Sequence, residues 1–295
     1  MFASGGLVTV RARIMRVTRD QTVLLTGATG GLGTVIANAL AQRGAKLALV
    51  AFPGDGLEPL RAALEKKGAQ AAVWATDLRN ADQRQLMLEA VRQTFGEVDI
   101  LINNAGVEFT CAYHELSENN LRDILNINLA VPMDLTRRVL PAMLRRGAGH
   151  IVNISSLAGK AGPAFQEPYA ATKAGLVAFT SSLRATYRGT GVSASAVVPG
   201  FVEAGIYANL KARSGYSAPP WLGTSKPEAV ARAVVKVIEH DRLEQIVNPV
   251  PVRPLLALSA LFPNLGEWIA DRTGANGFFR KVEARLHPAL TASTK

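Results

Sequence analysis

The segment TVLLTGATGGLG, which runs from Thr22 to Gly33, decides the fold class of this 295-residue chain. An apolar run of strand length leads into four glycines, and an alanine-rich pattern with helical spacing follows over residues 32–43. Glycines let the backbone turn tightly and approach a pyrophosphate, whose charge is stabilised at the next helix N-terminus. We therefore expect this turn to bind a dinucleotide through Gly27, Thr29, Gly30, Gly31, Leu32 and Gly33.

Similar pairs of strand and helix recur along the chain. Near-continuous apolar runs, typical of strands buried on both faces, occur at residues 22–25, 46–52, 71–75, 100–103, 150–154, 192–198 and 245–247. Helical spacing fills the intervals at residues 57–67, 81–95, 121–146, 169–188 and 227–240. This alternation predicts an α/β fold with a doubly wound parallel sheet.

Length and composition favour one domain with extensions at both ends. The chain is 48% hydrophobic and 19% charged, so it can bury one substantial core. We assign the domain to residues 21–248, an N-terminal extension to residues 1–20 and a C-terminal extension to residues 249–295. Residues 1–14, which precede Met15, are expected to be dispensable.

Charge and cysteine content exclude several classes of protein. The net charge is +10, but no basic run is interleaved with stacking aromatics, so no nucleic acid is expected as a partner. The single cysteine, Cys111, rules out an internal disulfide, and the four histidines lack metal-ligand spacing, so we expect no metal. No apolar stretch reaches the roughly eighteen residues that a spanning helix needs, and we expect a cytoplasmic protein.

Two further segments suit the same cofactor. Asp77-Leu78 follows the third predicted strand, where the carboxylate can accept a hydrogen bond from the adenine amino group; capping of the next helix is the alternative. Asn103-Asn104-Ala105-Gly106 ends the fourth strand, and we expect Asn104, Ala105 and Gly106 to contact the dinucleotide. An ordinary turn is the alternative for that motif.

The choice between NAD and NADP depends on the residue that meets the ribose 2′ position at the end of the second strand. A carboxylate there selects NAD and an arginine selects NADP. The sequence is Ala51-Phe52-Pro53-Gly54-Asp55, with neither type in the nearest position. Loss of the acid removes repulsion of a 2′-phosphate and slightly favours NADP, whereas Asp55 would favour NAD if it turned inward.

A phenol and an ammonium group lie on one face of a predicted helix. Tyr169 and Lys173 are four residues apart, which places them one turn from each other. A nearby ammonium favours the tyrosinate, so we expect Lys173 to lower the pKa of Tyr169 and make it a general acid/base. Ser156 follows the fifth strand, where its hydroxyl can stabilise a developing oxyanion, although Ser155 and Ser156 could simply form a turn.

Taken in order, these motifs resemble a short-chain dehydrogenase/reductase of the compact single-domain branch, over roughly residues 20–248. The resemblance rests on the glycine turn, Asp77, Asn103 to Gly106, Asn128, Ser156, Tyr169, Lys173 and Pro199-Gly200. The glycine spacing also suits the family's larger epimerase and dehydratase members, since Gly27, Gly30 and Gly33 fit as well as Gly27, Gly31 and Gly33. The motif that begins at Asn103 and the short C-terminal region argue against that branch.

The resemblance implies a Rossmann-type three-layer α-β-α sandwich with about seven parallel strands and an NAD(P) cofactor. It implies that Tyr169 is the acid/base, that Lys173 also binds the nicotinamide ribose, and that Ser156 orients the carbonyl. Asn128 resembles the asparagine that bends a helix and holds a proton-relay water; Asn126 is the rival, and Asn128 is preferred because an apolar and a small residue follow it.

Further implications concern the cofactor site and assembly. The resemblance adds Pro199 and Gly200 to the cofactor site, together with Tyr169 and Lys173. Members commonly pair through two long helices, here about residues 121–146 and 169–188, so a homodimer or homotetramer is implied.

The predicted activity is hydride transfer between NAD(P) and a carbonyl or alcohol carbon. After Pro199-Gly200 an irregular segment, residues 201–224, is expected to form a lid over the site. Apolar side chains in this lid and in the tail favour a lipophilic substrate, such as a steroid, retinoid or fatty-chain compound. The alternative is that these side chains only pack the lid and a subunit interface.

Two other hypotheses stay open at this stage. A catalytically silent dinucleotide-binding scaffold or redox sensor would keep the fold without turnover. In addition, residues 250–262 could form a short amphipathic surface that makes peripheral contact with a membrane, although they are too few to span it.

Overall fold

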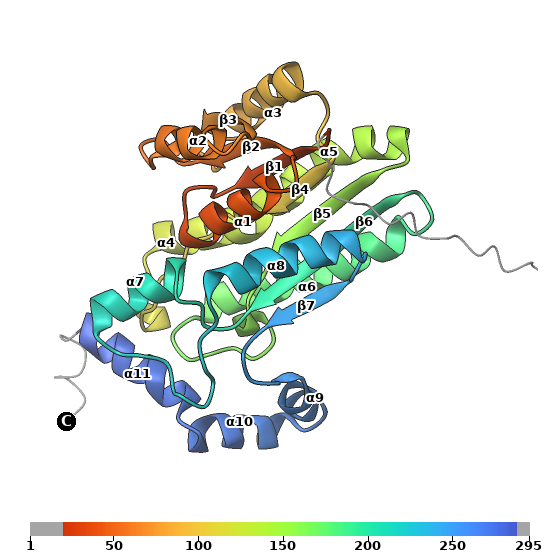
Figure 1. The fold of residues 1–295 in the computed structure, drawn as a ribbon. Helices are drawn as coiled ribbons and strands as arrows, with labels where there is room; N and C mark the ends of the chain where they lie inside the picture. The colour runs from red at the N-terminus through yellow and green to blue at the C-terminus, as the bar shows by residue number, and fades with distance from the viewer. Residues whose placement is uncertain (1–19, 288–295) are drawn as a thin grey trace, which may run out of the picture.

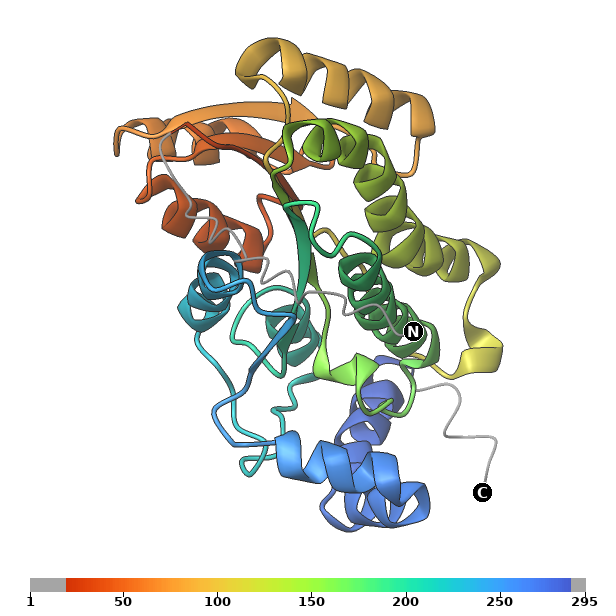
Figure 2. The same cartoon turned by 90° about the vertical axis from the view of Figure 1, so that its right-hand side faces the viewer.

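The computed structural model of the protein describes residues 20–287 (Figure 1). Of the expected N-terminal extension, residues 1–20, only Asp20 is among the described residues, so the segment 1–14 lies outside them. Residues 288–295 of the expected C-terminal extension also lie outside the described residues. Within the described range a central sheet carries helices on both faces, and three C-terminal helices gather at one end of the molecule (Figures 1 and 2).

Seven parallel strands form the sheet in the order β3-β2-β1-β4-β5-β6-β7. Their bounds are β1 Thr22–Thr26, β2 Lys46–Ala51, β3 Gln70–Ala75, β4 Ile100–Asn103, β5 Gly149–Ile154, β6 Val192–Pro199 and β7 Glu244–Val247. The predicted doubly wound parallel sheet is confirmed. The strand order reverses between β1 and β4, and such a switch point opens a crevice at the carboxyl ends of the strands.

Helices on both faces complete the three-layer sandwich. One hydrophobic cluster contains residues of α1 (Gly31–Ala41), α2 (Leu57–Glu65) and α8 (Pro227–Glu239), and the other contains residues of α3 (Ala81–Phe95), α5 (Val131–Arg146) and α6 (Glu167–Thr186). In β1, Val23 and Leu25 belong to the first cluster and Leu24 to the second, because successive strand side chains point to opposite faces. This double burial explains the continuous apolar run.

The helix predicted over residues 121–146 is interrupted. α4 ends at Leu125, a π-helical turn follows over Asn126–Ala130, and α5 continues to Arg146; α4 itself begins at Glu118. A π turn adds a residue to one helical turn and is frequent at functional sites. Hydrophobic spacing did not reveal it, because the buried residues Ile124, Val131 and Leu135 keep helical spacing across the interruption.

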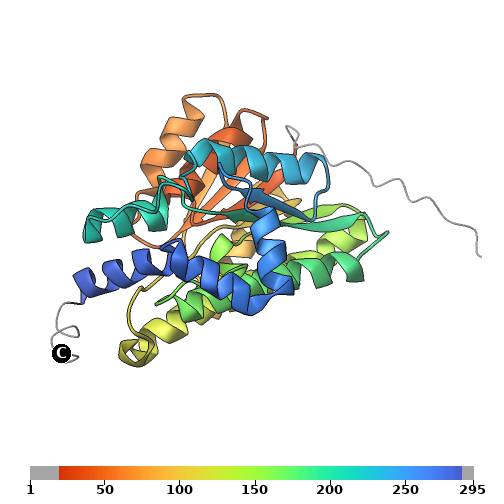
Figure 3. The same ribbon diagram turned by 90° about the horizontal axis from the view of Figure 1, so that it is seen from below.

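The lid and the tail are more regular than the sequence pattern predicts. The prediction that the lid is irregular is wrong over residues 205–214, which form α7 (Gly205–Ser214). The tail forms three helices, α9 (Arg253–Leu261), α10 (Pro263–Arg272) and α11 (Ala275–Leu286). α11 packs beside α7 at the open end of the sheet (Figures 1 and 3). Tyr207 and Leu210 of α7 are buried against Phe278, Phe279 and Val282 of α11. A short helix needs such tertiary packing, which local periodicity does not contain.

Candidate active site

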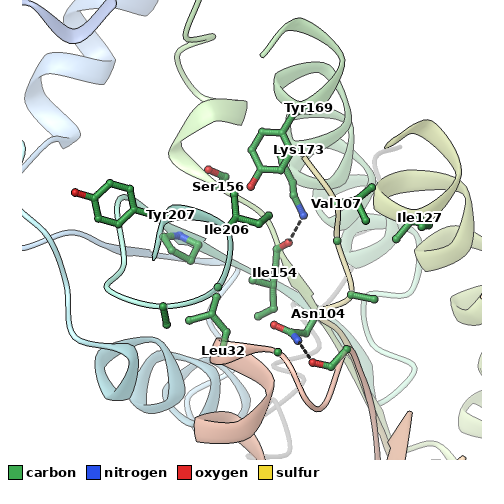
Figure 4. A pocket seen from close by; sticks show the side chains of 18 of the residues that line it. Leu32, Asn104, Val107, Ile127, Ile154, Ser156, Tyr169, Lys173, Ile206 and Tyr207 are labelled. Carbon is green, nitrogen blue, oxygen red and sulfur yellow. Dashed lines mark hydrogen bonds between the residues drawn. The ribbon is translucent and has the colours of Figure 1, made fainter. Parts of the chain in front are cut away.

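A cavity of about 700 Å³ lies at the carboxyl ends of the strands, beside the switch point. Segments from the glycine turn, the β4 and β5 ends, the start of α6 and the lid line it (Figure 4). Almost all of the predicted cofactor residues line this cavity: Gly27, Thr29, Gly30, Gly31, Leu32, Asp77, Leu78, Asn104, Ala105, Gly106, Tyr169, Lys173, Pro199 and Gly200. Ser156 lines it as well, whereas Gly33 and Asn128 lie behind its wall.

The glycine turn is built for close backbone approach. Gly27 has a φ of +63°, and a Cβ on Gly33 would lie 2.1 Å from the Gly27 carbonyl oxygen. Gly31 is different, because its Cβ would meet the backbone nitrogen of Gly205 in the lid at 2.6 Å. The turn itself therefore demands Gly27 and Gly33, while Gly31 allows the lid to approach. Without these glycines the backbone could not fold so tightly at the N-terminus of α1, and a turn of this kind beside the cavity fits the pyrophosphate of a nicotinamide dinucleotide.

The loop after β4 is tied to the glycine turn. Asn104 Nδ2 donates to the carbonyl oxygens of Thr26 at 3.0 Å and Gly27 at 2.9 Å, and the backbone nitrogen of Ala105 donates to Thr26 Oγ1 at 3.1 Å. Asn103 instead points into the core, where its Nδ2 donates to Asn153 Oδ1 at 2.8 Å. The two neighbouring asparagines thus play different parts, and Asn104 borders the cavity.

The alternative interpretation of Asp77 as a helix cap is wrong. Asn80 caps α3, because its side chain accepts from the backbone nitrogens of Asp82 and Gln83. The Asp77 carboxylate pairs with the Arg79 guanidinium at 2.9 Å, which holds the pKa of Asp77 below its usual value. Asp77 is therefore an ionised acceptor on the cavity wall, free of any capping role.

Arg79 is a cavity residue that sequence reasoning missed. Its guanidinium lies 5.5 Å from the ring centroid of Phe52, the residue directly after β2, and 3.0 Å from the carboxylate of Asp123. All three side chains line the cavity. The signal in the sequence that could have identified Arg79 was a cationic residue two positions after Asp77. Its relevance depends on the pairing of β2 with β3, which brings the ends of those strands together.

Ser156 and Tyr169 converge at the β5 end of the cavity (Figure 4). The Ser156 hydroxyl caps the turn that follows it by accepting from the backbone nitrogen of Ala158 at 3.1 Å, and its influence on the phenol of Tyr169 lowers the pKa of that phenol. Ser155 is buried, and its hydroxyl donates to the carbonyl oxygen of Lys173 at 2.7 Å. Ser155 therefore holds α6 against β5, and Ser156 is the serine that faces the cavity.

The pKa of Tyr169 is raised rather than lowered, contrary to the expectation from Lys173. Burial raises it to about 12, and the charge of Glu108 adds to the rise, while the neighbouring Ser156 hydroxyl opposes both. Lys173 Nζ does not offset the burial: it donates to the carbonyl oxygen of Ile154 at 3.0 Å and lies 5.5 Å from the Tyr169 ring centroid. Burial also lowers the pKa of Lys173 to about 8. The phenol is therefore protonated at neutral pH and able to donate.

Asn128 occupies the π turn and joins it to the loop after β4. Its Oδ1 accepts from the backbone nitrogen of Val107 at 2.8 Å, and its Nδ2 donates to the Val107 carbonyl oxygen at 2.8 Å. Asn128 is fully buried, whereas Asn126 is half-buried. The geometry favours Asn128 over Asn126 as the residue that positions the cavity wall.

Replacing Asn128 with alanine is expected to lower the free energy of unfolding by about 3 kcal/mol, because both polar atoms of Val107 would lose their partner inside the protein. Urea unfolding followed by circular dichroism measures the change. Asn126→Ala is the matched control and should cost under about 1 kcal/mol. Equal losses in the two variants would contradict the role given to Asn128.

A polar cluster that sequence reasoning did not predict lies beside the cavity. Gln166 Nε2 donates to Glu108 Oε1 at 3.0 Å and to Thr110 Oγ1 at 3.1 Å, and the Thr110 hydroxyl also bonds Glu108. Burial raises the pKa of Glu108, while the hydrogen bonds and the charge of Arg213 oppose that rise. No motif marks these residues, since they meet only where the loop after β4 passes the start of α6.

Glu108→Gln is expected to lower the pKa of Tyr169, because the charge of Glu108 contributes to raising it. The alkaline decline of carbonyl reduction should therefore begin at a lower pH, and alcohol oxidation, which needs the phenolate, should rise at a lower pH. Rate–pH profiles in both directions measure this. Glu115→Gln, a change at an exposed carboxylate, should leave both profiles in place; identical profiles for all three proteins would refute the coupling.

Comparisons with known proteins agree with this geometry. The family model of short chain dehydrogenases matches residues 21–215. A ketoacyl reductase, HetN, of Nostoc sp. is 41% identical over 284 residues, which cover 94% of this chain and 98% of that protein. The 3-oxoacyl-[acyl-carrier-protein] reductase FabG of Escherichia coli is 36% identical over 180 residues, 61% of this chain and 72% of that protein.

Solved structures give a similar result. An actinorhodin polyketide ketoreductase variant with NADPH has a TM-score of 0.73 and 31% identity, covering 77% of this chain and 95% of that one. A metagenomic short-chain oxidoreductase in complex with NADP has a TM-score of 0.68 and 29% identity, and the match covers 80% of this chain and 100% of that chain.

Proposed function

This chain belongs to the short-chain dehydrogenase/reductase family, and on that premise we propose that it reduces the ketone of a β-ketoacyl thioester with NADPH. The protein is an NAD(P)-dependent oxidoreductase that acts on a carbonyl or alcohol carbon. The observation that carries the proposal is the protonated phenol of Tyr169, buried beside Ser156 on the cavity next to the glycine turn. The ketoacyl substrate is supported by the names of the relatives. A silent scaffold is not favoured.

In the proposed reaction each cavity residue has one task. When bound, the nicotinamide dinucleotide supplies the hydride. The Ser156 hydroxyl donates to the ketone oxygen and orients it, and the Tyr169 phenol gives its proton to that oxygen as negative charge develops. Lys173 lines the same wall one turn from Tyr169 and would hold the nicotinamide ribose. Asn128 acts through the Val107 loop and so positions the wall without touching substrate.

We assign the catalytic domain to residues 21–248, with a lid at residues 201–224 and a C-terminal extension at residues 249–295. The seven-stranded sheet lies within the first range, from Thr22 to Val247. The remaining cofactor contacts are assigned to the glycine turn, Asp77-Leu78, Asn104 to Gly106 and Pro199-Gly200, all of which border the cavity except Gly33.

The preference for NADP is part of the proposal. Phe52 stands directly after β2 in place of a carboxylate, and the Arg79 guanidinium lies over its ring. The two structures described above, with NADPH and with NADP, support the same preference. Asp55 is exposed at the rim, and it is the side chain that would oppose a 2′-phosphate.

Phe52→Asp is expected to reverse the cofactor preference, raising kcat/KM with NADH relative to NADPH by about 100-fold, because a carboxylate accepts from the ribose hydroxyl and repels the 2′-phosphate. Steady-state rates with both cofactors measure this ratio. Phe52→Asn has the same size without the charge and should shift it far less. An unchanged ratio in Phe52→Asp would place the 2′ group elsewhere.

The test of the proposed reaction is oxidation of NADPH by the purified full chain against a panel of carbonyl compounds. β-Ketoacyl thioesters should be turned over with higher kcat/KM than small polar sugars, because the site joins a proton donor to apolar walls. Activity confined to sugars or polyols would end both the ketoacyl and the lipophilic proposals. Binding of NADPH without turnover on any carbonyl would instead favour the silent scaffold.

Assembly and location complete the proposal. We propose a cytoplasmic homodimer or homotetramer that pairs through α5 and α6, on the resemblance described above, and sedimentation velocity tests the oligomeric state.

No helix within residues 20–287 is long and apolar enough to cross a bilayer. Peripheral contact through residues 250–262 predicts stronger binding to anionic liposomes by the full chain than by a chain ending at Asn248; equal partitioning would dispose of it.

A further inference from the structure

A second cavity, of about 220 Å³, adjoins the first and is lined in part by the C-terminal helices. The two cavities share wall residues, namely Ser156, Gln166, Gly200, Phe201 and Phe279. Ser156 is the hydroxyl that meets Tyr169, so the second cavity begins at the point where the carbonyl would be reduced. It then extends away from the glycine turn, towards α9 and α10.

The lining of this second cavity is uncharged. Among the described residues that form its wall, none is Asp, Glu, Lys, Arg or His, and much of the wall is aliphatic. Three of its polar side chains beyond the shared end bond to protein: Asn248 Nδ2 donates to the Leu222 and Val250 carbonyl oxygens, Thr273 Oγ1 donates to that of Ile269, and Asn276 Nδ2 donates to Asp271 Oδ1. The first cavity differs, since its far end carries Asp55, Asp77, Arg79 and Asp123.

The tail builds this cavity by close packing. α9 and α10 approach so tightly that a Cβ on Gly266 would lie 2.6 Å from the Ser259 Cβ. Trp221 in the lid donates from its indole nitrogen to the carbonyl oxygen of Thr273 at 2.8 Å, which ties the lid to the tail. At the shared end, the ring of Phe201 stacks on that of Phe279 with centroids 6.1 Å apart. The helices α9 and α10 lie beyond residue 215, where the match to the family model ends.

We propose that the second cavity binds the aliphatic tail of the substrate whose ketone lies at Ser156 and Tyr169, so that α9 and α10 select acyl chain length. This inference rests on the proposed function. A charged or hydrated group would lose its water in an uncharged pocket without gaining partners, whereas methylene groups gain by leaving water. The thioester side of the substrate must then leave through the wider first cavity, where polar groups are available.

The test compares acetoacetyl and β-ketodecanoyl N-acetylcysteamine thioesters. In the wild type, kcat/KM should rise with chain length by up to about fourfold for each methylene until the cavity is full. Ala270→Phe, which fills the cavity from α10, should lower kcat/KM for the longer substrate by at least about tenfold and leave the shorter one within about twofold. Ala257→Phe, at an exposed position of α9 outside the cavity, should change neither value.

Two further measurements separate this inference from the proposed function and from misfolding. Energy transfer from tryptophan to cis-parinaric acid reports binding of an aliphatic chain without turnover, and Ala270→Phe should weaken it at least about tenfold. Leu256→Ala should enlarge the cavity and move the optimum to longer chains. A wild type that binds the probe but reduces no thioester would overturn the proposed function alone. Equal effects of Ala270→Phe and Ala257→Phe on both substrates and on the probe would overturn the tail subsite.

Discussion

Tyr169→Phe is expected to lower kcat for carbonyl reduction by about 1,000-fold while NADPH still binds. The change removes one oxygen from a ring that is only 9% exposed, so packing is retained and the proton donor is lost. Burial raises the pKa of Tyr169 to about 12, which keeps the phenol protonated over the working range. The one other phenol among the described residues that line the cavity, Tyr207, has its hydroxyl oxygen occupied as the acceptor for the backbone nitrogen of Ala218 at 2.9 Å.

The measurement is single-turnover oxidation of NADPH, with cofactor affinity determined separately by energy transfer from tryptophan. Tyr187→Phe is the matched control, since Tyr187 caps the same helix, α6, outside the cavity, and it should keep full activity. A Tyr169→Phe enzyme that retained more than about a tenth of the wild-type kcat would exclude Tyr169 as the acid, since general acid catalysis contributes at least about 100-fold.

Gly33→Ala is expected to weaken NADPH binding by more than about 100-fold and to destabilise the fold by about 1–3 kcal/mol. The added Cβ would lie 2.1 Å from the Gly27 carbonyl oxygen and 2.7 Å from the Ala28 carbonyl carbon. Both neighbours are backbone atoms of the turn itself, so relief requires α1 to move away from β1. The cradle for the pyrophosphate would move with it.

Calorimetric titration with NADPH and thermal unfolding measure the two effects. Gly277→Ala is the control, because no heavy atom of residues 20–287 beyond the adjacent backbone of its own helix lies within 4 Å of the added Cβ, and the residue sits inside α11. That change should leave NADPH affinity unaltered and stabilise the protein slightly, through the higher helix propensity of alanine. Normal NADPH affinity in Gly33→Ala would mean that the dinucleotide does not use this turn.

Much of the fold followed from patterns that are local in the sequence. The buried strands read as continuous apolar runs because each contacts helices on both faces, as Val23 and Leu24 show. The glycine turn and the four-residue spacing of Tyr169 and Lys173 are equally local. The lid helix α7 escaped, because packing against α11 determines it. The π turn at Asn126–Ala130 escaped the hydrophobic spacing, because it is joined to the loop after β4 by the hydrogen bonds to Val107, although the resemblance implied a helix bend at Asn128.

By itself, then, the sequence determined the order of the strands and of the helices that pack on the sheet, the glycine turn, and the placement of Tyr169 and Lys173 on one helix, since backbone geometry and hydrophobic period act over a few residues. Tertiary structure alone decided the pairing of Asp77 with Arg79, the cluster of Glu108 and Gln166, and the uncharged cavity beneath α9 and α10. It also decided the direction of the Tyr169 pKa shift. Desolvation depends on every atom that surrounds a group, and those atoms come from segments far apart in the chain.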